Sequence, residues 1–158
     1  MTHLSLLSFN TANGLRFWKM INSFKDENAF LSNFHPSPFR WNGLTAQTVE
    51  HAFQAWKMTK SQDMLDVLLC PSPGLAKRTA RKRPMREDWD KIKVSVMYDL
   101  LKRKFEIPEL KSLLLATGDQ ELVEGNHWGD VYWGKVGDNG KNMLGRLLML
   151  IREELRDA

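Results

Sequence analysis

The pattern that most limits the possible folds of this chain is an apolar stripe near its C-terminus. Between residues 142 and 156, large aliphatic side chains recur at spacings of three, one, three and four residues. They are Leu144, Leu147, Leu148, Ile151 and Leu155. This repeat places the side chains on one face of an α-helix. A helix with one apolar face is stable in water only when that face packs against other elements, so we expect a globular fold built mainly from helices.

Prolines and capping residues mark the other predicted helices. Pro71 ends one helix, and Ser72-Pro73 begins the next as an N-cap followed by proline in the first turn. The five helices predicted before the last are residues 46–59 with Thr45 as N-cap, 61–70, one beginning at 72–73, 87–105, and 108–118. Short strands are predicted at 21–24, 39–41 and 121–124. The sequence therefore predicts a mostly helical α+β fold, a single domain with a small β-sheet.

The 158 residues fit one domain. Residues 1–19 look separable from it, because two apolar runs, Leu4–Phe9 and Leu15–Met20, flank the hairpin-type turn signal Asn13-Gly14. We therefore predict an N-terminal extension of uncertain structure over residues 1–19 and a folded domain over residues 20–158.

The composition indicates the cellular compartment in which this protein is expected to work. No apolar run approaches the roughly 18 residues that a membrane span needs, so no membrane association is expected. The single cysteine, Cys70, excludes an internal disulfide framework and fits a reducing compartment. We predict a cytoplasmic protein.

Positive charge is concentrated in one segment. The net charge is +4, and five of the seven residues from Lys77 to Arg83 are basic. Such a segment is typical of a phosphate or nucleic-acid patch, but it could equally be the solvated end of a helix. Charge alone does not separate a nucleotide from a nucleic acid.

Metal and cysteine chemistry find little support in the sequence. None of the four histidines has another at the i, i+4 spacing of a helical zinc pair. Cys70 lies at an apolar helix end, where burial would raise its pKa and reduce its reactivity. Motifs of a nucleophile elbow, a P-loop or a dinucleotide-binding turn are absent from the sequence. We expect a site without a metal or a redox cofactor.

The stretch TVEHAFQAWK, residues 48–57, carries two parallel stripes. Glu50, Gln54 and Lys57 fall at i, i+4 and i+7, beside a neighbouring apolar stripe. This pattern fits either an ordinary surface helix or a polar stripe directed into a pocket. In the second case the helix dipole would help to keep Glu50 ionised near the helix start, which suits a carboxylate that must stabilise a cationic sugar.

A second group of candidate residues lies in the long irregular segment 124–142. EGNHWGDVYWG, residues 124–134, combines aromatic side chains, which can stack on bases, with glycines that allow close backbone approach to a ligand. GDNGKN, residues 137–142, leads into the last helix, whose N-terminus could bind an anion. An aromatic mini-core and a plain N-cap are the alternatives. With a basic segment for phosphate, these features suggest a pocket for a phosphorylated ribosyl compound.

Four motifs in order along the chain resemble those of the NADAR (YbiA-like) family. They are FLSNF at 30–34, VEHAFQAWK at 49–57, LVEGN at 122–126 with YWG at 132–134, and KNMLGRLLMLIR at 141–152. The similarity runs from about Met20 to Leu155. It implies an N-glycosidase that hydrolyses the bond between ribose C1′ and a nitrogen. The implied substrates are phosphorylated ribosylamino-pyrimidine intermediates of riboflavin synthesis or, alternatively, ADP-ribose attached to guanine in nucleic acid.

The resemblance also suggests roles for individual residues. Glu50 and Asp130 would be the catalytic carboxylates, with Glu50 ionised beside the oxocarbenium-like transition state. The substrate-binding residues it implies are Asn33, Phe34, Lys57, Arg78, Trp89, Trp133 and Asn142. Among these, the two tryptophans would sandwich the base, while Lys57 and the helix start at Asn142 would hold phosphate. A reader domain that binds ADP-ribose without cleaving it is the alternative from a different functional class.

Overall fold

The computed structural model describes residues 7–11 and 14–158, with side chains described from Lys19 onward. It divides into two compact units, each described by itself. The central unit comprises Asn33–Leu110, and the terminal unit comprises Met1–Ser32 with Lys111–Ala158.

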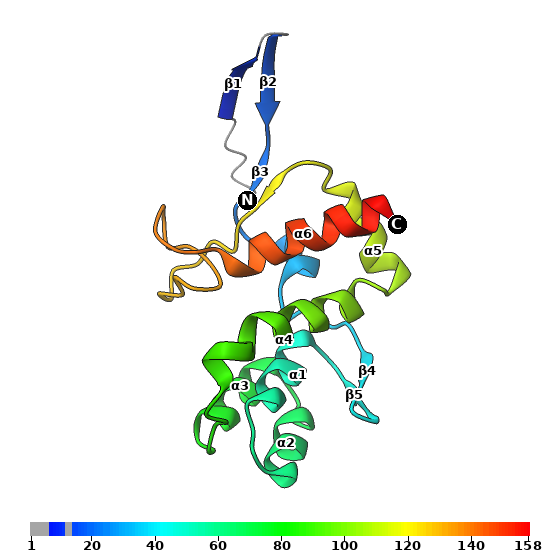
Figure 1. Ribbon diagram of the computed structural model, residues 1–158, viewed down its shortest axis with the longest axis vertical. Helices are drawn as coiled ribbons and strands as arrows, with labels where there is room; N and C mark the ends of the chain where they lie inside the picture. Colours follow the sequence, from blue (N-terminus) through cyan, green and yellow to red (C-terminus); the bar gives the residue numbers. More distant parts are fainter. Residues whose placement is uncertain (1–6, 12–13) are drawn as a thin grey trace. The chain divides into compact units, whose positions relative to one another are not determined.

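In the central unit, one short helix is surrounded by three others. Its elements are β4 (Phe39–Trp41), β5 (Leu44–Ala46), α1 (Val49–Trp56), α2 (Ser61–Leu68), α3 (Pro73–Arg81) and α4 (Trp89–Lys104). Helix α1 packs against α2, α3 and α4 (Figure 1). Helix α5 (Pro108–Ala116) begins in this unit and continues into the terminal one. Because α1 is enclosed, its side chains form much of the core of this unit.

The start of α1 differs from the sequence-based expectation. Thr45, the predicted N-cap, lies in strand β5, which pairs with β4 around a tight turn at Asn42-Gly43. Both turn residues have positive φ, 50° and 77°, as a type I′ hairpin turn requires. The hairpin uses the residues up to Ala46, so the helix begins later. Thr48 is the cap, and its side chain accepts a hydrogen bond of 3.2 Å from the backbone N–H of His51.

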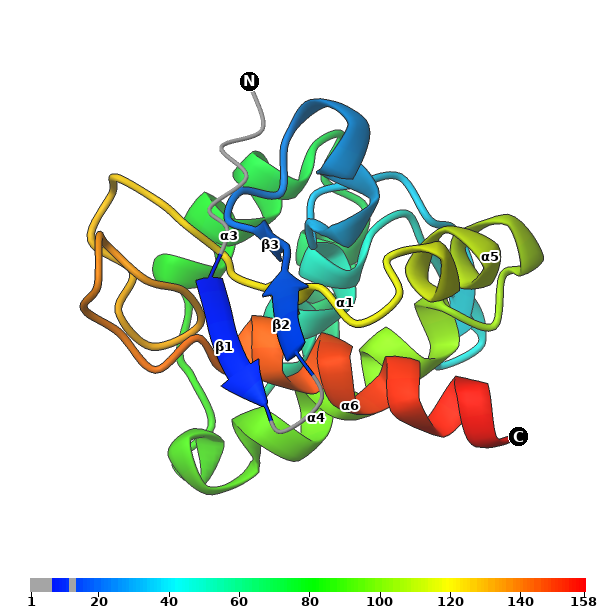
Figure 2. The same cartoon turned by 90° about the horizontal axis from the view of Figure 1, so that it is seen from above.

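The terminal unit holds the remaining elements. They are β1 (Leu7–Thr11), β2 (Gly14–Trp18), β3 (Met20–Ile21), the 3-10 helix η1 (Asp26–Leu31), β6 (Glu121–Leu122) and α6 (Met143–Asp157). Strands β1 and β2 run antiparallel, side by side (Figure 2). This pairing agrees with the predicted hairpin, although Asn13 of its turn lies outside the described residues. Strands β3 and β6 pair in parallel, and α6 packs on β6.

The mostly helical α+β prediction is confirmed. The predicted helices are all present, most of them shorter than predicted, and β4 has the predicted limits. The β-structure differs in detail, because the described strands form three separate pairs instead of one small sheet. Within the described part of the chain, no helix combines the length and apolar character needed to cross a membrane.

Candidate active site

Both stripes of α1 are buried. Gln54 is 2% exposed and Glu50 7%, although they occupy the polar stripe, and Val49 and Phe53 of the apolar stripe are 0% and 4% exposed. A surface helix would leave its polar stripe in water. The surface alternative for residues 48–57 is therefore excluded, and the carboxylate of Glu50 lies inside the central unit.

Glu50 is held by its neighbours on two sides. Gln54 Nε2 donates a hydrogen bond of 2.7 Å to Glu50 Oε1, and the backbone N–H of Glu50 donates to the carbonyl oxygen of Asn33 at 3.1 Å. The second contact joins two of the motifs that the sequence analysis singled out, SNF and EH. Their proximity in space could not be read from their separation of about 16 residues in the chain.

Burial raises the pKa of Glu50 above the ordinary carboxyl value. The hydrogen bond from Gln54 and the positive charges of Lys77 and Lys57 oppose this effect. From the sequence, the helix N-terminus is expected to keep Glu50 ionised, and Glu50 does lie in the first turn of α1. In the folded protein, however, the loss of solvent around the carboxyl group has the largest effect on the pKa of Glu50. A carboxyl group with a raised pKa is suited to exchanging protons with a substrate or water near neutral pH.

Lys57 caps the C-terminal end of α1. Burial lowers the pKa of its ammonium group; the Glu50 charge opposes this, and the like charges of Lys77, Arg81 and Lys93 add to it. Its Nζ lies 5.3 Å from the ring centroid of Phe53 and 5.6 Å from that of Trp89, within the range of cation–π attraction. The aromatic rings thus position the ammonium group.

Two buried amide oxygens near Glu50 lack hydrogen-bond partners. They are Gln54 Oε1 and Asn33 Oδ1. The amide nitrogen of each residue is engaged, that of Gln54 by Glu50 and that of Asn33 by Met97 Sδ at 3.5 Å. An unpaired buried acceptor costs about 1–3 kcal/mol, so folding alone does not account for both of them. Hydroxyl or amino groups of a bound substrate are the donors that would satisfy them.

His51 has a structural role beside the catalytic candidate. Its Nε2 donates to the carbonyl oxygen of Cys70 at 2.8 Å, and its Nδ1 lies 2.8 Å from the hydroxyl oxygen of Thr48. Because a carbonyl can only accept, Nε2 carries a proton, and in the neutral ring Nδ1 accepts from the hydroxyl. Both nitrogens are occupied, and the ring ties the start of α1 to the end of α2.

The other predicted residues of the central unit fall into different environments. Trp89, the first residue of α4, is only 5% exposed and meets Phe53 edge-on at 5.0 Å. It forms the wall behind Lys57 rather than an open stacking surface. Phe34 is 45% exposed, next to Asn33. Arg78 is exposed on α3, next to Lys77, and its place in the site stays a prediction.

In the terminal unit, Asp130 organises a loop. Its Oδ1 accepts hydrogen bonds from the backbone N–H groups of Tyr132 and Trp133, at 3.1 and 2.9 Å. Its own N–H donates to Asn126 Oδ1 at 2.9 Å, and Asn126 Nδ2 donates to the Asp130 carbonyl at 2.8 Å. The side chain of Asp130 therefore shapes the YWG turn, in which the rings of Tyr132 and Trp133 meet edge-on at 4.9 Å.

Asn142 is also fully used within the terminal unit. Its Oδ1 accepts from the backbone N–H of Glu124 at 3.0 Å, and its Nδ2 donates to the carbonyl of Leu122 at 2.9 Å. The residue is buried and adopts the left-handed backbone region, with φ 51°, which asparagine tolerates better than most residues. It fastens the end of β6 to the start of α6.

The predicted phosphate site at the start of α6 is therefore corrected. The backbone N–H groups of Asn142, Met143 and Leu144 donate to the carbonyls of Gly134, Tyr132 and Trp133, at 3.2, 3.0 and 3.0 Å. Amides that already have carbonyl partners do not form an anion site. The segment that the sequence analysis considered as ligand-binding is instead the N-terminal cap of this helix.

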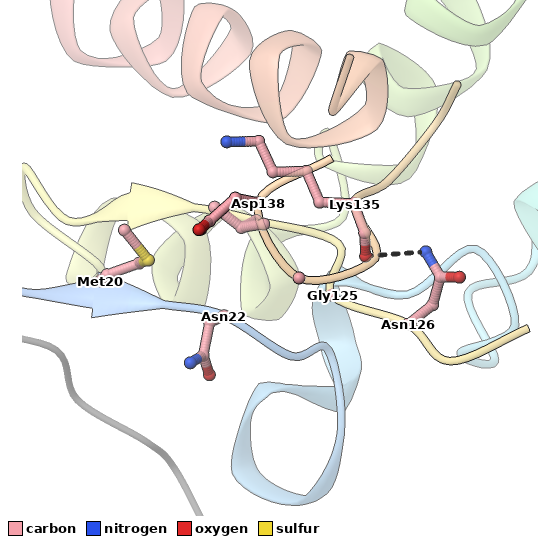
Figure 3. A pocket seen from close by; sticks show the side chains of 8 residues that line it. Met20, Asn22, Gly125, Asn126, Lys135 and Asp138 are labelled. Carbon is pink, nitrogen blue, oxygen red and sulfur yellow. Dashed lines mark hydrogen bonds between the residues drawn. The ribbon is translucent and has the colours of Figure 1, made fainter. Parts of the chain in front are cut away.

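A pocket of about 530 Å³ lies beside this loop (Figure 3). Among the residues that line it are Asn22, Gly125, Asn126, Lys135 and Asp138. The Asn126 side chain donates to the Lys135 carbonyl at 3.2 Å, which fixes one wall. This pocket contains neither Asp130 nor Trp133 in its lining.

Comparison with known proteins assigns the chain to a family. The model of the NADAR domain matches residues 16–156. N-glycosidase YbiA of Escherichia coli (strain K12) is 42% identical over 137 residues, which cover 84% of this chain and 85% of the relative. The chain belongs to the NADAR domain family.

Other relatives and one solved structure support the same family assignment. N-glycosidase Npun_R5314 of Nostoc punctiforme is 36% identical over 134 residues, covering 80% of this chain and 85% of the relative. Riboflavin biosynthesis protein VVA0006 of Vibrio vulnificus is 40% identical over 137 residues, covering 84% of this chain and 37% of the larger relative. The NMR structure of the E. coli protein YbiA superposes with a TM-score of 0.77 at 40% identity, over 85% of this chain and 82% of that one.

These relationships confirm the NADAR prediction, its fold, and the prediction of an N-glycosidase, a hydrolase of N-glycosidic bonds. They do not favour the reader domain as an alternative. The roles of single residues rest on the geometry above. That geometry adds Gln54 to the surroundings of Glu50. The charge of Lys77 also acts on the pKa of Glu50, and the charges of Arg81 and Lys93 act on the pKa of Lys57. The i, i+4 spacing to Glu50 already placed Gln54 on the polar stripe, whereas the contributions of α3 and α4 depend on helix packing.

Proposed function

We propose that this NADAR protein hydrolyses the C1′–N bond of a phosphorylated ribosylamino-pyrimidine, with Glu50 as the catalytic carboxylate. The observation that carries the proposal is the burial of Glu50 beside Gln54, Lys57 and two unpaired amide oxygens. The substrate class follows the names of relatives, two of which are riboflavin biosynthesis proteins.

Cleavage of a ribosyl C–N bond develops positive charge at C1′. A fixed carboxylate stabilises that charge more strongly in a site from which water is excluded than it would in solvent. Glu50 in its ionised form would lie beside C1′ and orient the attacking water. Its raised pKa suits it to accept the proton that this water releases as the new C–O bond forms, and to pass a proton to the nitrogen that leaves as the C1′–N bond breaks.

The groups around Glu50 have complementary tasks. Gln54 fixes the carboxylate by its hydrogen bond and presents its free Oε1 to a hydroxyl or amino group of the substrate. Asn33 presents Oδ1 in the same way. Lys57, held over two aromatic rings, supplies positive charge for an anionic part of the substrate or for a sugar hydroxyl. Asp130 has its Oδ1 occupied by two backbone amides, so we place the chemistry on Glu50 first.

The proposal is tested with the Glu50→Gln variant and a panel of substrates. The wild-type chain should release the pyrimidine from the ribosylamino-pyrimidine phosphate, and the variant should do so about 10²–10⁴ times more slowly, with an unchanged far-UV spectrum. The matched control is Glu87→Gln, which changes an exposed carboxylate. Wild-type turnover by a folded Glu50→Gln variant would remove Glu50 from the mechanism.

A second substrate is favoured by one observation. Arg78, Arg81 and Lys82 are exposed on or at the end of α3, which packs against α1, and such a basic surface would suit ADP-ribosylated guanine in nucleic acid. The panel therefore includes DNA with this modification. Release of ADP-ribose that falls steeply with salt would favour the polymeric substrate, and release of only the pyrimidine would favour the small metabolite.

A further inference from the structure

The short segment between α3 and α4 crosses the end of α1. The backbone N–H of Arg86 donates to the carbonyl oxygen of Lys57 at 2.8 Å, and beside this bond Met58 and Met85 form an antiparallel β-bridge. Lys57 is the C-cap of α1, where carbonyl groups have no partner within the helix. Met85 and Arg86 therefore hold the backbone of the residue that carries the ammonium group of the candidate site.

The side chain of Arg86 contacts both helices that meet at this point. Its guanidinium carbon lies 5.6 Å from the ring centroid of Trp56, the last residue of α1, within the range of cation–π attraction. Its Nε and Nη2 donate to the two carboxylate oxygens of Asp88, at 2.7 and 3.2 Å. Two bonds to one carboxylate fix the orientation of the guanidinium group more strictly than a single ion pair would.

Asp88 connects this arrangement to the wall of the candidate site. It is the N-cap of α4, and Trp89 follows it as the first residue of that helix, with its ring 5.6 Å from Lys57 Nζ. Among the described residues, the carboxylate of Asp88 makes no capping hydrogen bond with α4 and pairs with Arg86 instead. Helices α1 and α4 pack together (Figure 1). Arg86 thus contacts Trp56 and Asp88, the chain neighbours of the two residues that meet there.

We propose that Arg86 is a positioning residue for the reaction, which acts by holding the Lys57 ammonium group in place between α1 and α4. The inference rests on the proposed function, in which Lys57 meets an anionic part or a hydroxyl group of the substrate. Arg86 acts without touching the substrate, because its guanidinium group is engaged by Asp88 and the Trp56 ring. Displacement of a reacting or binding group by about 1 Å can slow an enzyme about 10²-fold.

The pKa of Lys57 responds to the position of its ammonium group. Burial lowers this pKa. The charged groups that act on it are Glu50 of α1, Lys77 and Arg81 of α3, and Lys93 of α4. If the contacts of Arg86 are lost, water reaches the ammonium group more easily, and the pKa of Lys57 should rise toward the ordinary value of 10.5. Removing Arg86 and Asp88 together leaves the net charge unchanged, so that a rise in the double variant reports geometry.

The reactivity of Lys57 tests this role without turnover. Wild type and variants are labelled with a trace of an amine-reactive anhydride over a series of pH values, and mass spectrometry of the peptides gives the labelling of each lysine. The Lys57 midpoint should lie below 10.5 in the wild type and rise in Arg86→Gln and in Arg86→Gln/Asp88→Asn. The matched control is Arg103→Gln, an exposed arginine in the last turn of α4 that donates to the Arg40 carbonyl at 3.1 Å. It should leave the midpoint unchanged.

Kinetics separate this inference from the proposed function. We expect kcat/KM of Arg86→Gln to fall about 10- to 100-fold, and the alkaline limb of its rate–pH profile to move to higher pH together with the labelling midpoint. Arg86→Lys keeps the charge but not the two-bond geometry, so it should recover only part of the rate. This variant carries the same test if Arg86→Gln does not fold.

Two kinds of result would overturn the positioning role. One is a Lys57 labelling midpoint that stays at the wild-type value in the Arg86 variants, or that rises equally in Arg103→Gln. The other is a wild-type rate in a folded Arg86→Gln protein. If the midpoints move as expected but the wild-type chain cleaves no N-glycosidic substrate, the proposed reaction is refuted while the placement of Lys57 by Arg86 stands.

Discussion

The surroundings of Glu50 and the loop of residues 124–142 are rich in the same polar residue types but use them differently. Around Glu50, the buried amide oxygens of Gln54 and Asn33 have no hydrogen-bond partner. In the loop, Asn142 uses both ends of its amide, and Asn126 and Asp130 hold each other and the YWG backbone. The two amide oxygens near Glu50 are available to a ligand, whereas the side chains of Asn126, Asp130 and Asn142 hold the loop in place.

The largest expected effect is a loss of stability when a side chain is added at a close backbone contact in the terminal unit. A Cβ at Gly145 would lie 2.0 Å from the Leu122 carbonyl oxygen and 2.5 Å from Asn142 Nδ2. We expect Gly145→Ala to lower the free energy of unfolding by about 3 kcal/mol or more, measured by urea denaturation. The control is Gly74→Ala in α3, where the nearest atom is 3.8 Å away. Equal stability of the two variants would contradict this description of the α6 start.

Asn142→Ala should have the next largest effect. It removes a buried acceptor from the N–H of Glu124 and a donor from the carbonyl of Leu122. Leaving buried backbone groups unpaired costs about 1–3 kcal/mol each, so we expect a loss of roughly 2–4 kcal/mol in the same urea measurement. An Asn142→Ala protein of wild-type stability that no longer binds ribose 5-phosphate would show instead that this residue acts on the ligand.

Gln54→Leu should affect rate and pH dependence more than stability. The amide of Gln54 donates to Glu50, and this hydrogen bond lowers the pKa of that carboxyl. Without it the pKa rises further. If the ionised form is the active one, the acidic limb of the rate–pH profile moves to higher pH, and the rate at neutral pH falls about tenfold or less. A profile that moves to lower pH would contradict this assignment.

The pH dependence of stability offers a smaller but direct test of the burial of Glu50. Above the ordinary carboxyl pKa of 4.5, the unfolded chain loses a proton that the native carboxyl, with its raised pKa, still holds. Native stability therefore falls as the pH rises through that interval. Gln does not titrate, so the stability of Glu50→Gln relative to wild type should increase from pH 4.5 upward and then level off. A difference that decreases with pH would mean that the carboxyl pKa is lowered.

The smallest effect is expected for Asp130→Asn. The amide oxygen of asparagine can still accept from Tyr132 and Trp133, so we expect a rate within about threefold of wild type and little loss of stability. Asp130→Ala should lose about 1–2 kcal/mol, because both loop amides lose their acceptor. A fall of 10² or more in kcat for a stable Asp130→Asn would restore the second catalytic carboxylate that the sequence suggested.

Much of the helical fold could be read from local signals. Ser72 and Pro73 predicted the start of α3, and the side chain of Ser72 does accept from Leu75 N–H at 3.2 Å. The start of α1 was predicted three residues early, because Thr45 and Thr48 are equally good caps in isolation. The neighbouring hairpin decided between them. The strands predicted at 21–24 and 121–124 correspond to β3 and β6, which are shorter. Their parallel pairing joins segments about 100 residues apart, and for that pairing the sequence holds no local signal.

The sequence by itself determined the helices, the family and the reaction class, because the spacing of apolar residues, the caps and the motif residues are properties of short stretches of chain. Tertiary structure alone decided which polar residues keep hydrogen-bonding atoms available for a ligand. Glu50 and Asn142 look alike in the sequence, as polar residues within a motif. In the structure Glu50 is buried beside two amide oxygens without partners, while Asn142 has both ends of its amide bonded to backbone. Burial, pKa and hydrogen-bond partners arise from packing between distant segments, and no stretch of sequence contains them.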